Sequence, residues 1–218
     1  MPEKRDEAVE GDGGSSTGLD SLCVLDAVIC VHFVGANLQR LLVDVLRAAQ
    51  LVLLVPEEVH QEVLGKARKY GSIEAPWRRL VASDCVRVLP ALRAATAPPR
   101  VVEVFEEIRG LQFEKALRRP KDLGEAVVIA HAVEFVERGH EVFVAIDDQE
   151  GQATSARYDL TVLTIEQVLQ LAILHGRFPT EGELKRAYAR LRSYGDGLVD
   201  YGRTELPTAF KEWRASRP

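Results

Sequence analysis

The sequence has few cysteines, no excess of positive charge and no long hydrophobic run. Its three cysteines, Cys23, Cys30 and Cys85, form no Cys-x-x-Cys pair, and structural zinc sites usually need such closely spaced ligands. An odd number of cysteines in apolar surroundings predicts free structural thiols in a reducing compartment, so we expect a cytoplasmic protein. Because no apolar segment is long enough to cross a bilayer or resembles a secretory signal, we expect no membrane partner.

The net charge of -5 argues against bulk electrostatic binding to nucleic acid, so any such contact must use local basic patches. The sequence offers two such patches, namely Lys115, Arg118, Arg119 and Lys121, and Lys66, Arg68 and Lys69. The first directly precedes a predicted helix and is the candidate RNA-binding set, because it can hold phosphates there. Both patches are equally well explained as solvated surface.

Three segments of different character divide the 218 residues. Residues 1–19 combine mixed charge with Gly and Ser, which predicts a disordered leader. Residues 20–177 carry the apolar periodicity of one folded domain. Residues 178–218 contain basic residues at helical spacing and then Gly and Pro, which predicts a helical appendage packed on the core or on a partner.

Strand and helix patterns alternate along the middle segment. Short apolar runs predict strands at 21–25, 51–55, 85–89, 141–146 and 160–164, with segments of helical spacing between them. Asp122 is expected to cap a helix from about 123 to 138, and Thr180 to begin a helix in the C-terminal segment. This alternation predicts βαβ units, a mainly parallel sheet and the α/β fold class.

Four acidic residues, Asp26, Glu62, Glu125 and Asp147, lie at or just after these strand-to-helix junctions, and Asp148 follows the last of them. Because the carboxyl ends of parallel strands share one edge of a sheet, these side chains are expected to meet there. Clustered carboxylates without a basic partner suit a hard divalent cation. Since strand side chains alternate, we expect one of the two adjacent aspartates to face the other acids and predict Asp147.

Each acid also has a purely structural explanation. Asp26 can be a helix cap, Glu62 the solvated border of an amphipathic helix, and Glu125 an acid that stabilises the helix dipole. The two adjacent aspartates can belong to a turn. His131, in a helix that is apolar nearly all round, is expected to be a packing residue rather than a ligand.

The order of the acids resembles that of PIN-domain nucleases, in particular the toxin-like branch found in bacterial and archaeal toxin-antitoxin pairs. The resemblance spans roughly Leu22 to Gly176 and is carried by VLDAVICVHFVGANLQRLL, LLVPEEVHQEVL, DLGEAVVIAHAVE and VFVAIDDQEGQATSARYDLTVLTIEQVLQLAILHG. It implies a three-layer α/β/α sandwich with a mainly parallel central sheet and a Mg²⁺- or Mn²⁺-dependent endoribonuclease. The partners that it implies are an RNA substrate, an antitoxin protein and a second copy in a homodimer.

The resemblance also implies roles for the acids. The catalytic set is Asp26, Glu62, Glu125 and Asp147, and the metal ligands are Asp26, Glu125, Asp147 and the accessory Asp148. A cation held there would activate water and neutralise charge on the phosphate, while Glu62 would hold a second ion or orient the water.

Two positions depart from the family pattern. Ala27 and Val28 stand where a serine or threonine often follows the first aspartate, and Gln152 replaces a common arginine after the fourth acid. These departures favour an alternative, a catalytically silent module that binds RNA or protein, whereas the retained acids oppose it. A phosphoacceptor receiver module fits less well, because a single acid follows the first strand and no lysine follows the last.

Overall fold

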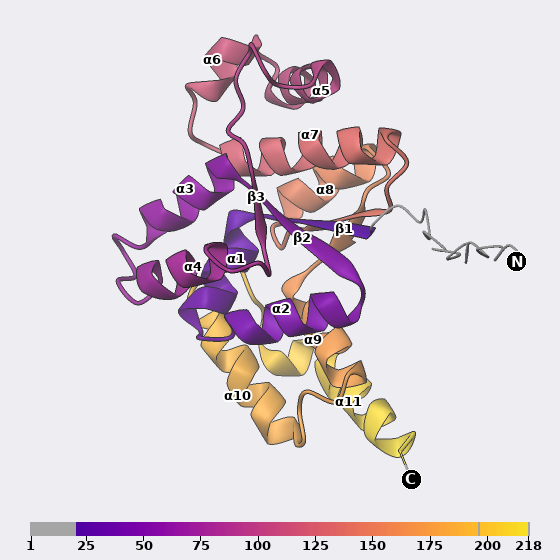
Figure 1. The fold of residues 1–218 in the computed structure, drawn as a ribbon. Coiled ribbons are helices and arrows are strands. Elements are labelled where there is room, and N and C mark those ends of the chain that lie inside the picture. The colour runs from indigo at the N-terminus through magenta and orange to yellow at the C-terminus, as the bar shows by residue number, and fades with distance from the viewer. Residues whose placement is uncertain (1–20, 196, 218) are drawn as a thin grey trace, which may run out of the picture.

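The computed structural model describes residues 21–195 and 197–217, so the predicted leader lies outside the described residues. The described chain is an α/β protein built on one parallel sheet with the strand order β3-β2-β1-β4-β5, and this confirms the predicted fold class (Figure 1). The strands are β1 (Ser21–Leu25), β2 (Leu51–Pro56), β3 (Arg87–Leu89), β4 (Val142–Ala145) and β5 (Thr161–Leu163).

The central strand β1 pairs with β2 on one side and with β4 on the other. Cys23 lies opposite Leu53 of β2 and Phe143 of β4. From β1 the chain continues outward to β2 and β3, and it then returns to the other side of β1 for β4 and β5. The connections therefore reverse direction between β1 and β4, which makes the carboxyl ends of these two strands the topological switch point of the sheet.

Helices cover both faces of the sheet (Figure 1). The helix α7 lies on one face against β1, β2 and β4, and α5 packs outside it. On the other face α2 packs on β2 and on α9, which contacts β5. The helices are α1 (Ala27–Gly35), α2 (Gln39–Ala48), α3 (Glu57–Lys66), α4 (Glu74–Val81), α5 (Pro99–Arg109), α6 (Phe113–Leu117), α7 (Leu123–Glu137), α8 (Gln149–Arg157), α9 (Ile165–Leu174), α10 (Glu181–Arg192), the 3₁₀ helix η1 (Tyr201–Arg203) and α11 (Leu206–Ala215).

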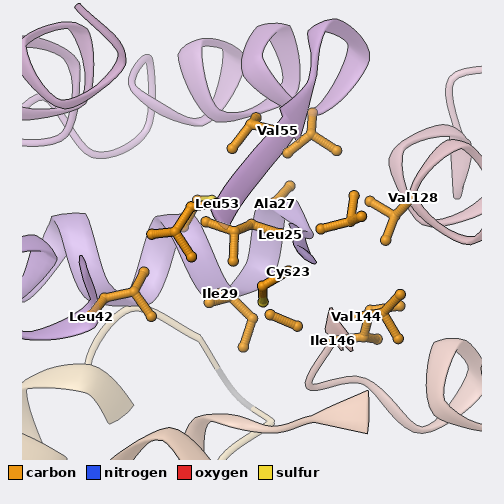
Figure 2. Close-up of a cluster of buried hydrophobic side chains, with 14 of the residues drawn as sticks. Cys23, Leu25, Ala27, Ile29, Leu42, Leu53, Val55, Val128, Val144 and Ile146 are labelled. Carbon is orange, nitrogen blue, oxygen red and sulfur yellow. The ribbon is translucent and has the colours of Figure 1, made fainter. Parts of the chain in front are cut away.

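The core fills the space on both sides of the strands. In Figure 2, Leu42 of α2 and Val128 of α7 lie on opposite sides of a group that includes the strand residues Cys23 and Leu53. All four side chains are buried. Burial raises the pKa of the Cys23 thiol to about 12, so this cysteine stays protonated and packs as a small apolar side chain, as the sequence predicted.

The C-terminal segment packs against the rest of the chain. The helix α10 contacts α1, and α11 contacts α9. Leu184, Leu191, Leu206 and Phe210 are buried in the same core as the sheet. As the sequence predicted, Thr180 begins α10, and its hydroxyl accepts a hydrogen bond from the Glu183 N–H.

Two local predictions differ from the structure. The strand β3 begins at Arg87 rather than at Cys85. Asp122 does precede α7, but it has a left-handed backbone (φ 54°), and its side chain makes no capping hydrogen bond. Among the described helices, none combines the length and apolarity that a membrane crossing requires.

Candidate acidic site

The acids gather at the switch point between β1 and β4. Asp26 directly follows β1, and Asp147 and Asp148 follow β4. The Asp26 N–H donates to the Ala145 carbonyl at 3.0 Å, so the two strand ends remain paired up to the acids. Because α/β sheets bind ligands at this edge, the position of these acids makes them candidate functional residues.

Asp26 is a buried carboxyl group that also caps a helix. Only 4% of the residue is exposed, and its Oδ2 accepts a hydrogen bond of 3.2 Å from the Val28 N–H at the start of α1. Burial raises the pKa of the Asp26 carboxyl to about 7, and the charges of Glu62 and Asp148 act in the same direction against the backbone hydrogen bonds. Asp26 is therefore both the cap of α1 and a member of the acid cluster.

Glu62 and Glu125 reach the site from α3 and α7, two helices that pack against each other. Gly124 permits this approach, since a Cβ there would lie 2.9 Å from Glu62 Oε2 and 3.7 Å from Asp26 Oδ1. Burial raises the pKa of Glu125 to about 7, with further contributions from Asp148 and Asp26. Burial also raises the pKa of Glu62, while Lys66 opposes the shift.

The two adjacent aspartates divide between two environments. Asp148 faces the other acids: its charge raises the pKa of both Asp26 and Glu125, and a Cβ at Gly151 would lie 2.9 Å from Asp148 Oδ2 and 3.1 Å from Glu125 Cδ. Asp148 Oδ1 also accepts from the Gly151 N–H at 2.8 Å and caps α8.

Asp147 instead lies toward α9 and α1. Its Oδ1 accepts a hydrogen bond of 2.8 Å from the Ile165 N–H, and the charged neighbours that act on its pKa are His32 and Asp148. The prediction that Asp147 rather than Asp148 faces the other acids is therefore wrong. The physical reason is that β4 ends at Ala145, so the alternation of strand side chains does not extend to these residues.

Beside the acids lies a cavity of about 430 Å³, within the range of small-ligand pockets. Glu62, Asp147 and Asp148 line it, and so do three basic residues, Lys66, Lys69 and Arg192. Ala27 and Val28, the two residues after Asp26, line it as well. Gln152 donates from Nε2 to the Asp147 carbonyl at 2.8 Å.

The predicted RNA-binding set lies elsewhere. Lys115 is on α6, and Arg118, Arg119 and Lys121 follow it, all of them exposed. None of these four is among the described residues that line the cavity. Lys121 is linked to the acids only through Asp122, with which it forms an ion pair of 3.5 Å. The charge of Asp122 raises the pKa of Glu62 and of Glu125.

Of the second basic patch, Lys66 and Lys69 line the cavity, whereas Arg68 lines a different depression together with Glu74 and Arg78. Sequence reasoning missed the contribution of α10, where Arg192 and the following Ser193 and Tyr194 complete the cavity wall. These residues lie outside the segments that resemble PIN domains, and no local pattern marked them.

The acids fit a hard divalent cation in the chemistry of their donors. Asp26, Glu62, Glu125 and Asp148 offer carboxylate oxygens whose mutual repulsion a cation would relieve. As their side chains stand, however, no three acidic, histidine or cysteine side chains in the described part of the chain form a ready ligand set. Binding would therefore require the carboxylates to turn toward one another.

In comparisons with protein-family models, curated proteins and solved structures, none matched this chain.

Proposed function

We propose that this protein is a metal-dependent endoribonuclease of the kind that serves as the toxin of a toxin-antitoxin pair. The observation that carries the proposal is the partly buried acid cluster at the topological switch point, where two carboxyl groups, Asp26 and Glu125, have pKa values raised to about 7. Together with the resemblance of the acid motifs to PIN-domain nucleases, this arrangement favours phosphodiester hydrolysis over the receiver alternative.

Asp26, Glu125 and Asp148 are the residues that would hold Mg²⁺ or Mn²⁺. Such a cation supplies a water nucleophile at neutral pH and offsets negative charge on the phosphate. Glu62, whose Oε2 lies against Gly124 beside Asp26, would orient the water or accept its proton. Asp147 holds the start of α9 through Ile165 and so fixes the position of its neighbour Asp148.

A catalytically silent module with this fold is the second candidate. It is favoured because three of the acids already have structural tasks: Asp26 and Asp148 cap α1 and α8, and Asp147 holds Ile165. In that case the acids would serve helix starts, and RNA or protein binding would be the only activity.

Cleavage of a mixed RNA pool with Mn²⁺, and again with EDTA, separates the two candidates. We expect cleavage with Mn²⁺ that EDTA abolishes. Asp148→Asn and Glu125→Gln should each lower the rate by roughly 100-fold or more, because each removes charge that the transition state needs.

Glu212→Gln is the matched control, since Glu212 is an exposed acid on α11. It should cleave like the wild type. If the wild type, Asp148→Asn and Glu125→Gln all leave the pool intact under Mn²⁺, the nuclease proposal fails and the silent module replaces it. If all three cleave equally, the acid cluster is not the active site.

A further inference from the structure

The segment Arg192–Gly195, at the end of α10, lines the cavity beside the acids and is anchored to α1. His32 Nδ1 donates to the Leu191 carbonyl at 2.8 Å, and a Cβ at Gly195 would lie only 2.5 Å from His32 Nε2. The Tyr194 ring lies directly on Gly35, where a Cβ would come within 2.4 Å of it. These contacts hold Arg192–Gly195 in one position, because they need the His32 ring and the absence of a side chain at Gly35 and Gly195. The segment is therefore a preorganised wall of the cavity.

This wall and the end of α3 contribute three basic side chains to a cavity that Glu62, Asp147 and Asp148 also line. Arg192 donates from Nε to the Leu198 carbonyl at 3.1 Å and from Nη1 to Asp200 at 2.5 Å, which fixes the plane of its guanidinium group. The group has more N–H donors than these two bonds use. Lys66 and Lys69 line the same cavity from α3 and the turn after it.

Two aromatic rings complete the lining. Tyr70 and Tyr194 meet edge to face, with ring centroids 5.5 Å apart and an angle of 62° between their planes. Lys69 Nζ lies 5.0 Å from the centroid of the Tyr70 ring. Basic groups interleaved with aromatic rings are the chemistry by which proteins hold single-stranded nucleic acid, since the cations contact phosphates and the rings contact bases.

We propose that the C-terminal wall and the end of α3 form a nucleotide-binding subsite for single-stranded RNA next to the acid cluster. Arg192 and Lys69 contact the backbone phosphates, and Tyr70 contacts a base. The inference rests on the proposed function for the identity of the ligand, and it adds a substrate site that the C-terminal segment builds. It also explains how a chain of net negative charge binds RNA: the positive charge is local and lies where the acids alone would repel phosphate.

The test is the affinity of the full chain for a short fluorescein-labelled single-stranded RNA, measured by fluorescence anisotropy over a range of salt concentrations. Each titration is run in EDTA and again with Mg²⁺. Arg192→Gln should weaken binding roughly 10-fold and lower the salt slope by about 1, as expected for the loss of one phosphate contact. Arg190→Gln is the matched control, because Arg190 is an exposed arginine on the same helix that faces a different depression.

Tyr70 is tested with a pair of variants. Tyr70→Ala should weaken binding at least about 5-fold, whereas Tyr70→Phe, which keeps the ring, should bind like the wild type. Circular dichroism and melting of each variant show whether the fold is retained. If Tyr70→Ala does not fold, the Arg192 and Arg190 pair decides the question alone.

The outcomes separate this inference from the nuclease proposal. If the wild type binds RNA, the variants lose binding and no condition gives cleavage, then the subsite stands and the nuclease proposal fails. If the wild type cleaves RNA while Arg192→Gln and Tyr70→Ala bind as it does, the subsite is wrong and the nuclease proposal is unaffected. An absence of RNA binding by the wild type, in EDTA and in Mg²⁺ alike, overturns the subsite as well.

Discussion

At the scale of single residues, the buried carboxyl group of Asp26 destabilises the folded protein when it is ionised. Its pKa is raised to about 7, far above the ordinary value of 3.8 that it regains on unfolding. A carboxyl group whose pKa is higher in the folded state stabilises the protein at low pH, and this stabilisation is lost as the pH rises through 7. Without a cation, the protein should therefore lose stability as the pH rises from about 4 to 7, and this loss should level off above pH 7.

Asp26→Asn tests this directly. Asparagine keeps the size of the side chain and an oxygen that can cap α1, but it removes the buried charge. In EDTA at pH 8 we expect the variant to exceed the wild type in free energy of unfolding by roughly 1–3 kcal/mol, and the difference should shrink as the pH falls toward 4. Urea denaturation at several pH values measures it. A variant that is less stable at pH 8 would show that the Asp26 charge is not costly.

His131 has the opposite pH dependence. Burial lowers the pKa of its ring to about 4, and within the described structure its Nε2 has no hydrogen-bond partner. Because the unfolded chain takes up this proton at higher pH than the folded one, stability should be lost as the pH falls from 6.5 toward 4. His131→Leu should remove that loss and raise stability at pH 5 by about 1 kcal/mol or more. His175→Gln, at an exposed histidine, should leave the acid limb of the stability curve unchanged.

At the scale of elements, Asp147 and Thr164 together determine how α9 begins. Thr164 accepts from the Gln167 N–H, the Gln167 side chain accepts from the Thr164 N–H, and Asp147 accepts from the Ile165 N–H. This capping box and its added carboxylate satisfy N–H groups that a helix start leaves unpaired.

This arrangement lets the structural and chemical roles of Asp147 be separated. Thr164→Ala should lower the free energy of unfolding by about 1 kcal/mol without changing Mn²⁺ binding. Asp148→Asn should weaken Mn²⁺ binding in calorimetric titration, and Asp147→Asn should resemble Thr164→Ala. If Asp147→Asn abolishes Mn²⁺ binding while Asp148→Asn retains it, the assignment of the two aspartates must be exchanged.

The elements themselves were largely predictable from sequence, because their signals are local. Apolar runs fixed the five strands to within about two residues, and Thr180 marked the start of α10. The orientation of Asp147 and Asp148 was not predictable, since it depends on where β4 stops and α8 begins. Asp122 illustrates the same limit: its residue type suits a cap, but its left-handed backbone does not direct the side chain to the α7 N–H groups.

At the scale of the whole molecule, the sequence located the acids but not the cavity beside them. Asp26 and Asp148 follow the neighbouring strands β1 and β4, so one topological rule predicted their proximity. Glu62 and Glu125 reach them from the helices α3 and α7, which that rule does not place. The wall built by Arg192 and Tyr194 depends on how α10 packs on α1, and packing between distant segments leaves no periodic trace in a single sequence. The segment beyond 177 therefore has a larger part in the site than its sequence suggests.

Deletion of all residues from Phe178 onward tests whether the C-terminal segment contributes to the core and to the cavity. The deletion removes Leu184, Leu191, Leu206 and Phe210 from the core and uncovers apolar surface of α1 and α9. Exposed apolar faces of this kind favour association, so we expect a lower melting temperature and early elution or precipitation in size-exclusion chromatography. Among the described residues, ending the chain after Ala215 removes only the exposed Ser216 and Arg217, and this shorter deletion should preserve both properties. If the long deletion melts and elutes like the full chain, the C-terminal helices contribute neither to the core nor to the wall of the site.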